Sequence, residues 1–338
     1  MIYGNVELFN VERLEHRSGI PGVMLNRFSK AAVDGLDRGE DRRGNLTQSY
    51  CNDIEIRFET AAQEVTAEVG AWDNDGYIAV FNGEYFHSLH HLPEGRLSVL
   101  KLQRHPRLAL MPAVDDERFN RYIWRLVFLK RFQAVFGEIH TEQGKIGPPL
   151  YNIRPKTMLA YGSSITFGAG TGPASYLHHM WILARRLGYQ LENKSMPGSC
   201  FCEISYGDFL SDISADLYYY ELGGNMRLRH TPDEFRRRAE HLVKETRRKN
   251  PEAPIILLSI YPLLGSIPDE DHEKAARVIA SFNETIYHLA DPADRIFVVD
   301  SSQIISEPGL LSYDGLHPSG YGNIMMAERL YNIIKNMI

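Results

Sequence analysis

The period of the hydrophobic pattern changes once along this chain, close to Pro148 and Pro149, and this change limits the folds that the sequence can adopt. Before these prolines, apolar residues mostly alternate with polar ones, whereas after them short apolar runs alternate with stretches of helical period. A length of 338 residues is sufficient for two domains. We therefore predict that residues 1–152 form a first domain and residues 153–338 a second.

The first part is predicted to consist of β-strands. Ile54, Ile56 and Phe58 alternate with charged residues, which is typical of a strand that buries one face. The dipeptide Asn82-Gly83 favours a tight hairpin turn after another apolar run. Further strands are expected at residues 65–69, 77–81, 97–102, 122–128 and 132–140. Strands at this spacing, without a long helical pattern between them, predict an all-β, jelly-roll-like sandwich.

The second part is predicted to alternate strands with helices. Short apolar segments are expected to form five strands, at residues 158–161, 191–196, 216–222, 254–261 and 295–300. Segments of helical spacing occur at residues 173–187, 232–249, 273–289 and 319–335. This alternation predicts an α/β fold with a flavodoxin-like, doubly wound parallel sheet. Sheets of this kind bind ligands beyond the carboxyl ends of their strands.

Composition and charge exclude several classes of protein. The chain is 43% hydrophobic and 24% charged, as globular proteins are. Its net charge is −6 and neither part is basic, so we expect no nucleic-acid partner and no attraction to an anionic membrane. The sequence has no signal-peptide pattern and no apolar run long enough for a membrane helix. Three cysteines, an odd number, favour a reducing compartment, and we expect a cytoplasmic protein.

Residues that together can form a hydrolytic site follow the predicted strands of the second part. A serine hydroxyl becomes nucleophilic when a histidine accepts its proton, and a carboxylate orients that histidine. Asp314 and His317 are three residues apart, so one turn can bring the carboxylate to Nδ1 and leave Nε2 facing Ser164. The backbone N–H groups of Ser164 and Gly198 and the side-chain amide of Asn225 could form an oxyanion hole. The sequence therefore predicts a Ser-His-Asp triad.

These segments resemble the four sequence blocks of the SGNH (GDSL-type) serine hydrolase family. The blocks correspond to residues 162–166, 193–198, 221–225 and 314–318. The resemblance covers about residues 156–338. It departs from the family pattern at Ser163 and Met226, because the family commonly has Asp at both positions.

The resemblance implies a function as well as a fold. It implies that Ser164 is the nucleophile, that Gly198 and Asn225 belong to the oxyanion hole, and that the reaction is ester hydrolysis, often deacetylation of sugars. It also implies that the reaction uses no metal and no organic cofactor. A β-sandwich ahead of such a domain is similar to the two-domain carbohydrate esterases and related acyltransferases. The expected partner is a small-molecule or oligosaccharide ester.

Each candidate residue also has an ordinary structural explanation. Ser164 could cap the helix that follows it, Gly198 could serve only a tight bend, and Asn225 could be a loop residue with positive φ. Their occurrence at separate strand ends, together with the Asp314–His317 pair, favours catalysis. The histidines at 87, 90 and 91 lack the accompanying ligands of a metal site, and we expect them to be structural or on the surface.

The leading hypothesis is a serine esterase that removes small acyl groups, acetyl above all, from carbohydrates. One alternative is an acyltransferase that uses the same triad with an alcohol acceptor. Another is a carbohydrate-binding protein without catalytic activity. The presence of all five candidate residues argues against it: Ser164, Gly198, Asn225, Asp314 and His317. The sequence leaves open the acyl chain length, the alcohol, the choice between hydrolysis and transfer, the role of the first domain and the formation of homo-oligomers.

Overall fold

The computed structural model describes residues 1–36, 43–111, 118–151, 153–227, 229–262 and 272–338. These residues form two compact units. The sandwich unit comprises Met1–Ser29 and Gln48–Pro155, and the α/β unit comprises Lys30–Thr47 and Lys156–Ile338. The segment 30–47, which the hydrophobic pattern assigned to the first domain, therefore packs with the second unit. Within the described ranges, no helix combines the length and apolar character needed to cross a membrane.

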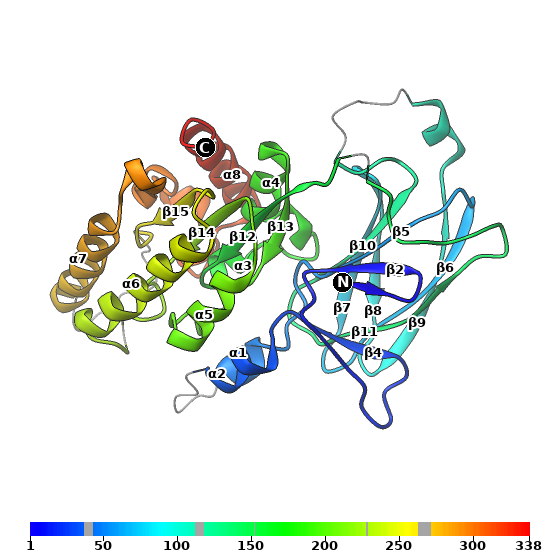
Figure 1. Cartoon of the computed structure of the whole chain (residues 1–338), viewed down its shortest axis with the longest axis horizontal. Helices are drawn as coiled ribbons and strands as arrows, with labels where there is room; N and C mark the ends of the chain where they lie inside the picture. The colour runs from blue at the N-terminus through cyan, green and yellow to red at the C-terminus, as the bar shows by residue number, and fades with distance from the viewer. Residues whose placement is uncertain (37–42, 112–117, 152, 228, 263–271) are drawn as a thin grey trace. The chain divides into compact units, whose positions relative to one another are not determined.

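Two antiparallel sheets form the sandwich unit (Figure 1). Within the described residues, one sheet has the strand order β1-β2-β5-β10-β7-β8 and the other β3-β4-β11-β6-β9. The strands are β1 (Ile2–Tyr3), β2 (Val6–Phe9), β3 (Arg13–Glu15), β4 (Val23–Asn26), β5 (Glu55–Glu59), β6 (Glu64–Ala71), β7 (Gly76–Asn82), β8 (Tyr85–Leu92), β9 (Arg96–Gln103), β10 (Ile123–Leu129) and β11 (Ala134–His140). The predicted β-sandwich is confirmed, although the sequence pattern did not show β1–β4 or β8.

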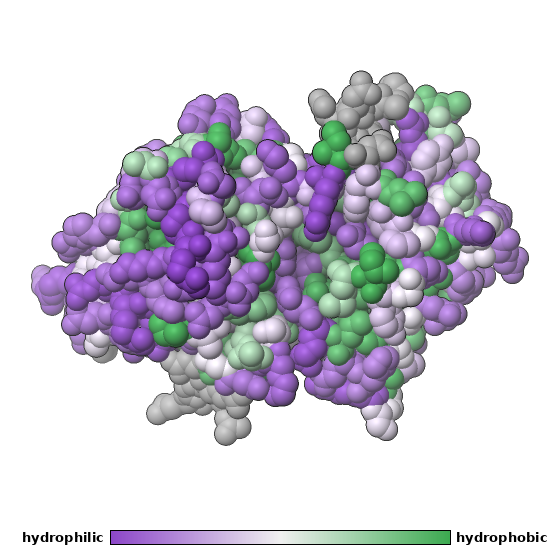
Figure 2. All heavy atoms as spheres, in the orientation of Figure 1, coloured by the Kyte–Doolittle hydropathy of each residue, from purple (hydrophilic) through white to green (hydrophobic). Residues whose placement is uncertain are grey.

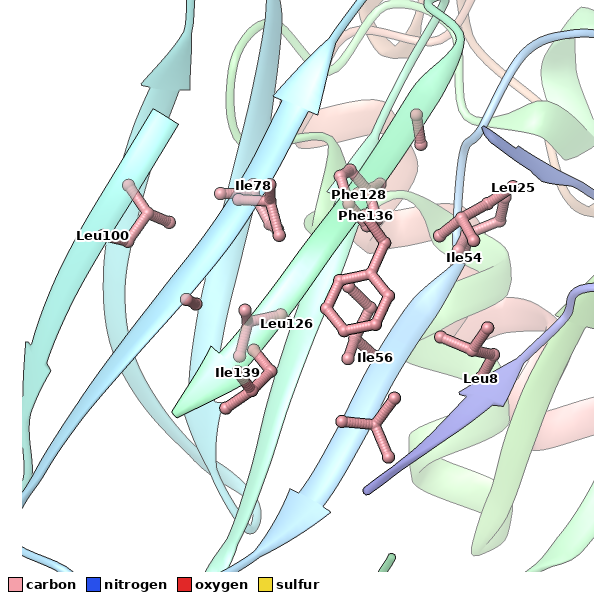
Figure 3. Packing of buried hydrophobic residues seen from close by; sticks show 14 of the residues in the cluster. Leu8, Leu25, Ile54, Ile56, Ile78, Leu100, Leu126, Phe128, Phe136 and Ile139 are labelled. Carbon is pink, nitrogen blue, oxygen red and sulfur yellow. The ribbon is translucent and has the colours of Figure 1, made fainter. Parts of the chain in front are cut away.

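The apolar faces of the two sheets meet in one core (Figure 3). Ile56 of β5 and Leu126 of β10 come from one sheet and Phe136 of β11 from the other, and all three are buried. The Asn82-Gly83 turn joins β7 to β8 as predicted. Gly83 has a φ of +58°, and a Cβ at this position would lie 2.6 Å from the carbonyl oxygen of Phe119. Only glycine fits this turn without strain.

The charged face of β5 is buried as well, which corrects the prediction that only one face of this strand is covered. Glu55 and Arg57 are 3% and 1% exposed. Oε2 of Glu55 accepts hydrogen bonds from Nε of Arg57 at 2.7 Å and from Nε of Arg125 on β10 at 3.0 Å. The guanidinium groups of Arg57 and Arg125 lie 4.8 and 4.0 Å from the ring centroid of Phe119. A charged residue can alternate with apolar ones and still be buried when oppositely charged partners accompany it.

A parallel sheet forms the centre of the α/β unit (Figure 1). Among the described residues its strand order is β13-β12-β14-β15-β16, which is the flavodoxin-like order. The strands are β12 (Lys156–Tyr161), β13 (Tyr189–Asn193), β14 (Leu217–Glu221), β15 (Ile255–Leu258) and β16 (Ile296–Val299). The predicted doubly wound sheet of five strands is confirmed.

Helices cover both faces of this sheet. They are α3 (Ser164–Phe167), α4 (His179–Leu187), α5 (Ile204–Asp212), α6 (Pro232–Lys249), α7 (His272–His288) and α8 (Gly320–Ile334). Helix α6 has the predicted bounds because Thr231 caps it, accepting the N–H of Glu234 at 3.2 Å, and Pro232 begins it. Its outer face is hydrophilic, as the purple surface over α6 shows (Figure 2).

One predicted helix starts later than expected. Residues 173–187 were predicted as a single helix, but α4 begins only at His179. His178 has extended backbone angles, φ −71° and ψ 155°, and separates α4 from a short 3-10 turn at Ser175–Leu177. Apolar spacing continues through both segments, so the spacing alone did not reveal the break.

The segment 30–47 contributes two short helices to the α/β unit, α1 (Lys30–Asp34) and α2 (Arg43–Thr47). Helix α1 packs against α5. The hydroxyl of Ser205 donates to the carbonyl oxygen of Gly35 at 3.1 Å, and a Cβ on Gly35 would lie 2.0 Å from that hydroxyl oxygen. Thr47 and Ser199 are both buried, with their hydroxyl oxygens 2.7 Å apart.

Candidate active site

The structure brings Ser164, His317 and Asp314 together. Ser164 is the first residue of α3, just beyond β12, and its hydroxyl oxygen lies 2.8 Å from Nε2 of His317. Nδ1 of His317 lies 2.7 Å from Oδ2 of Asp314. An ionised carboxylate only accepts hydrogen bonds, so Nδ1 of His317 is the donor to Asp314 and Nε2 is placed to accept the Ser164 hydroxyl. This is the arrangement that serine nucleophiles require.

A closed loop fixes Asp314 and His317. The N–H of Ser312 donates to the carbonyl oxygen of His317 at 2.7 Å, and Gly315 takes a positive φ of +62° within the loop. Oδ1 of Asp314 accepts hydrogen bonds from the Ser312 hydroxyl at 2.7 Å and from the N–H groups of Leu316 and His317, both at 2.9 Å. The carboxylate is thus oriented before any substrate arrives.

These contacts keep Asp314 ionised. Partial burial opposes ionisation, but the hydrogen bonds from His317, Leu316 and Ser312 outweigh it and hold the pKa of Asp314 well below its usual range. The side chains of Asp314 and His317 are 35% and 20% exposed, so water reaches the pair. Water access is needed if the site hydrolyses a covalent intermediate.

The turn that carries Ser164 is held at both ends. Ser163, at the position where the family commonly has Asp, caps α3 by accepting the N–H of Ile165 on its hydroxyl oxygen at 3.2 Å. Gly168 ends the helix with a φ of +97°, and a Cβ there would lie 2.6 Å from the ring of His178. Ser164 therefore occupies the first position of a short helix, where the backbone N–H has no partner within the helix.

Gly198 and Asn225 lie in the loops after β13 and β14. Gly198 has a φ of +74° in a turn in which the N–H of Ser199 donates to the carbonyl oxygen of Met196 at 3.2 Å. Pro197 before a glycine of positive φ is typical of a type II turn. The N–H of Cys200 donates to Oδ1 of Asn225 at 3.1 Å. This bond joins the two loops and leaves the Nδ2 group as the donor end of the Asn225 amide.

Sequence reasoning missed two side chains that support the turn carrying Ser164. Oε2 of Glu221 accepts three hydrogen bonds from Ser163 and Thr166. Nδ2 of Asn193 donates to the carbonyl oxygen of Thr166 at 3.2 Å. Both residues stand in the matched sequence blocks. A glutamate at the end of an otherwise apolar strand was a signal that a buried carboxylate needs partners.

The three cysteines are buried as free thiols. Burial raises the pKa of the Cys200 thiol well above its ordinary value, and the neighbouring Cys202 and Glu221 raise it further. A protonated thiol is a poor nucleophile, so Cys200 acts in packing. In the part of the chain that the structure describes, His, Cys, Asp and Glu side chains form no group of three or more that could hold a metal ion.

The sequence and fold agree with a known family. Residues 155–335 match the model of the GDSL-like lipase/acylhydrolase family. The match spans more than half of the chain, and the chain belongs to this family. Family membership supports esterase or acyltransferase activity. No curated protein matches the sequence.

Several solved structures share the two-part fold. The salicylyl-acyltransferase SsfX3 from a tetracycline biosynthetic pathway is 16% identical, with a TM-score of 0.77 over 98% of this chain and 96% of its own. A family two carbohydrate esterase from Cellvibrio japonicus is 15% identical, with a TM-score of 0.63 over 98% and 95%. A family two carbohydrate esterase from Clostridium thermocellum, solved with cellohexaose, is 18% identical, with a TM-score of 0.60 over 85% and 94%.

Proposed function

We propose that this protein is a serine esterase that removes small acyl groups, acetyl above all, from carbohydrates. The observation that carries the proposal is the continuous hydrogen-bond relay from Ser164 through His317 to Asp314, with distances of 2.8 and 2.7 Å. The structural likeness to two carbohydrate esterases, over 98% and 85% of the chain, supports the choice of substrate. The acidic net charge of −6 suits a neutral sugar ester, which needs no electrostatic attraction.

The first half of the reaction forms an acyl-enzyme. Nε2 of His317 takes the hydroxyl proton of Ser164 while Oγ attacks the ester carbonyl carbon. The negative charge that develops on the carbonyl oxygen is stabilised by the N–H groups of Ser164 and Gly198 and by the amide of Asn225. The tetrahedral intermediate then breaks its bond to the sugar oxygen, to which His317 returns the proton.

The second half releases the acyl group. His317 accepts a proton from water as the water oxygen attacks the acyl carbon, and it then protonates Oγ of Ser164 as the carboxylic acid leaves. Asp314 stabilises the imidazolium in both halves without accepting its proton. The enzyme returns to its starting state.

Hydrolysis of 4-nitrophenyl acetate and of acetylated xylo- and gluco-oligosaccharides tests this proposal. We expect Ser164→Ala to lower kcat by at least about 10³-fold while leaving the thermal midpoint unchanged, because only the nucleophile is lost. Ser175→Ala, a buried serine of the same unit, is the control. Equal rates for wild type and Ser164→Ala would refute the proposal. Binding of oligosaccharide without labelling of Ser164 by a fluorophosphonate would favour a non-catalytic protein.

Acyl transfer to an alcohol is the second candidate. The likeness to the salicylyl-acyltransferase, with a TM-score of 0.77, favours this alternative. The same triad serves both reactions, since only the group that attacks the acyl-enzyme differs. Product analysis with competing sugar acceptors separates them: hydrolysis yields free acid at all acceptor concentrations, whereas transfer yields a new ester whose share grows with the acceptor.

A further inference from the structure

A buried carboxylate lies directly behind the nucleophile. Glu221 is the last residue of β14 and is 3% exposed. Its Oε2 accepts hydrogen bonds from the N–H of Ser163 at 2.9 Å, from the hydroxyl of Ser163 at 2.9 Å and from the hydroxyl of Thr166 at 2.7 Å. Ser163 and Thr166 are 5% and 0% exposed, so these bonds are shielded from water. One carboxylate oxygen thus holds both sides of Ser164.

The register of the sheet places the carboxylate there. Tyr161 of β12 pairs with Tyr220 of β14, so the next residues, Gly162 and Glu221, lie side by side at the ends of the two strands. A Cβ on Gly162 would lie 2.7 Å from Oε2 of Glu221 and 2.5 Å from the hydroxyl oxygen of Thr166. Glycine at 162 therefore lets the carboxylate approach the turn, and a larger residue would displace it.

The hydrogen bonds also determine which way Ser163 donates. Its hydroxyl oxygen accepts the N–H of Ile165 at 3.2 Å, so its proton is directed to Glu221. The cap of α3 and the contact with Glu221 are therefore one network. Because Ser164 lies between Ser163 and Ile165, this network fixes its backbone and hence the directions of its N–H and its Cα–Cβ bond.

We infer that Glu221 is a positioning residue that holds the Ser164 hydroxyl and N–H in the geometry needed for proton transfer to His317 and for oxyanion binding. This inference rests on the proposed function. Glu221 acts through Ser163 and Thr166 and does not touch the reacting atoms. One buried oxygen of Glu221 accepts three hydrogen bonds from the turn, and removing it would leave three shielded donors without this acceptor. A displacement of about 1 Å in an active site can cost about 10²-fold in rate.

The experiment compares Glu221→Ala with Glu221→Gln, using 4-nitrophenyl acetate and counting active sites by fluorophosphonate titration. We expect Glu221→Ala to lower kcat by about 10²-fold with KM changed less than about threefold, because positioning affects the transition state. Glu221→Gln keeps an acceptor oxygen of the same shape, and we expect it to restore kcat to within about tenfold of wild type. A purely structural role would reduce the number of folded sites and leave kcat per site unchanged.

Thr246→Val is the matched control. The hydroxyl oxygens of Thr246 and Tyr220 lie 2.8 Å apart and are buried, so this variant removes a hydrogen bond at the residue next to Glu221 but away from Ser164. We expect a lower thermal midpoint with an unchanged kcat. If Glu221→Ala does not fold, Thr166→Val tests the inference in its place, because it removes one donor to Glu221 and keeps the shape of the side chain. A reduction of kcat by about three- to tenfold supports the inference.

Two outcomes overturn the inference, and a third concerns the proposed function. Glu221→Ala with a kcat per site within threefold of wild type would show that Glu221 does not position Ser164. If that variant does not fold, Thr166→Val with unchanged kcat would show the same. Retention of activity in Ser164→Ala would instead refute the serine mechanism itself, which keeps the two failures distinguishable.

Discussion

Two buried glutamates, one in each unit, differ in what compensates their charge. Glu55 of the sandwich unit and Glu221 of the α/β unit are each 3% exposed. Burial alone would raise both pKa values, but the charges of Arg125 and Arg57 lower the pKa of Glu55 to about 2. Glu221 receives its hydrogen bonds from hydroxyl and N–H groups, and burial raises its pKa despite them. Guanidinium groups offset the desolvation of a carboxylate, whereas these neutral donors offset it only in part.

The comparison separates a glutamate that stabilises its own unit from a glutamate that contacts the turn of the candidate nucleophile. The ionised Glu55 stabilises the sandwich, and its guanidinium partners are packed on aromatic rings. Glu221 costs the α/β unit stability when it is ionised, yet it contacts the turn that carries Ser164. A buried group that is electrostatically unfavourable is often found at a functional site. The predictions below test this division, beginning with the largest expected effect.

The largest expected effect is the loss of kcat on replacing a third carboxylate, that of Asp314. Asp314→Asn keeps the shape of the side chain but removes its charge, and an amide nitrogen at the Oδ2 position cannot accept the Nδ1 proton of His317. We expect kcat to fall by about 10⁴-fold and the thermal midpoint to fall as well, because the low pKa of Asp314 means that its ionised form stabilises the folded loop. Asp291→Asn is the control, since Asp291 caps a short 3-10 helix with the same kinds of bond. A loss of less than tenfold would contradict the role of Asp314.

Replacing Glu55 should lower the stability of the sandwich unit and leave kcat per folded site unchanged. Glu55→Gln leaves two buried guanidinium groups without their shared charged partner, and we expect the sandwich unit to lose about 3–5 kcal/mol of unfolding free energy. Urea unfolding followed by tryptophan fluorescence measures it, because Trp72 and Trp124 belong to this unit. Glu138→Gln, at a side chain 68% exposed, should cost less than about 1 kcal/mol. A changed kcat per folded site in Glu55→Gln would contradict the conclusion that Glu55 acts on stability alone.

Acid should destabilise the sandwich through the same residue. The pKa of Glu55 lies at about 2 in the folded protein and near 4.5 in the unfolded chain, so its contribution is present above pH 4.5 and is lost as the pH falls towards 2. A difference of this size corresponds to about 3 kcal/mol. We expect urea unfolding at a series of pH values to show this loss, and Glu55→Gln to remove it.

The contribution of Glu221 to the free energy of unfolding should change with pH in the opposite direction to that of Glu55. Its raised pKa means that its contribution is complete below pH 4.5 and is lost as the pH rises through the folded value. The stability of Glu221→Gln should therefore fall less than that of wild type over that range. Parallel curves for the two proteins would contradict the direction assigned to Glu221.

The smallest effect is expected from the segment 30–47. Thr47→Val removes the buried contact with the Ser199 hydroxyl and should cost the α/β unit about 1 kcal/mol, with kcat changed less than about threefold. Trp181 belongs to this unit and reports its unfolding. Thr141→Val, which removes a hydroxyl bonded to the carbonyl oxygen of Glu64, is the matched control in the sandwich unit. A loss seen only in the sandwich transition would place residues 30–47 with that unit.

The order of the elements could be predicted from the sequence because period and turn residues are local signals. Helix α6 and the hairpin after β7 agree with the prediction. Thr231 caps the helix that begins at the next residue, and Asn82-Gly83 forms the turn between adjacent strands, so both signals are local. Ser164, Asp314 and His317 could be selected as candidates because they stand in recognisable sequence blocks that follow predicted strands, and parallel strands end at one edge of the sheet.

Only the tertiary structure decided which charges are buried and what they contact. Arg57, two residues from Glu55, is a local partner, but no neighbour in the sequence shows that Glu55 also pairs with Arg125, 70 residues away, or that Glu221 accepts a hydrogen bond from Ser163, 58 residues away. The same holds for Thr47, whose contact with Ser199 spans 152 residues. Desolvation and hydrogen bonding depend on neighbours brought together by packing, so the sequence by itself determined the fold class and the candidate triad, and the folded chain determined the network that supports them.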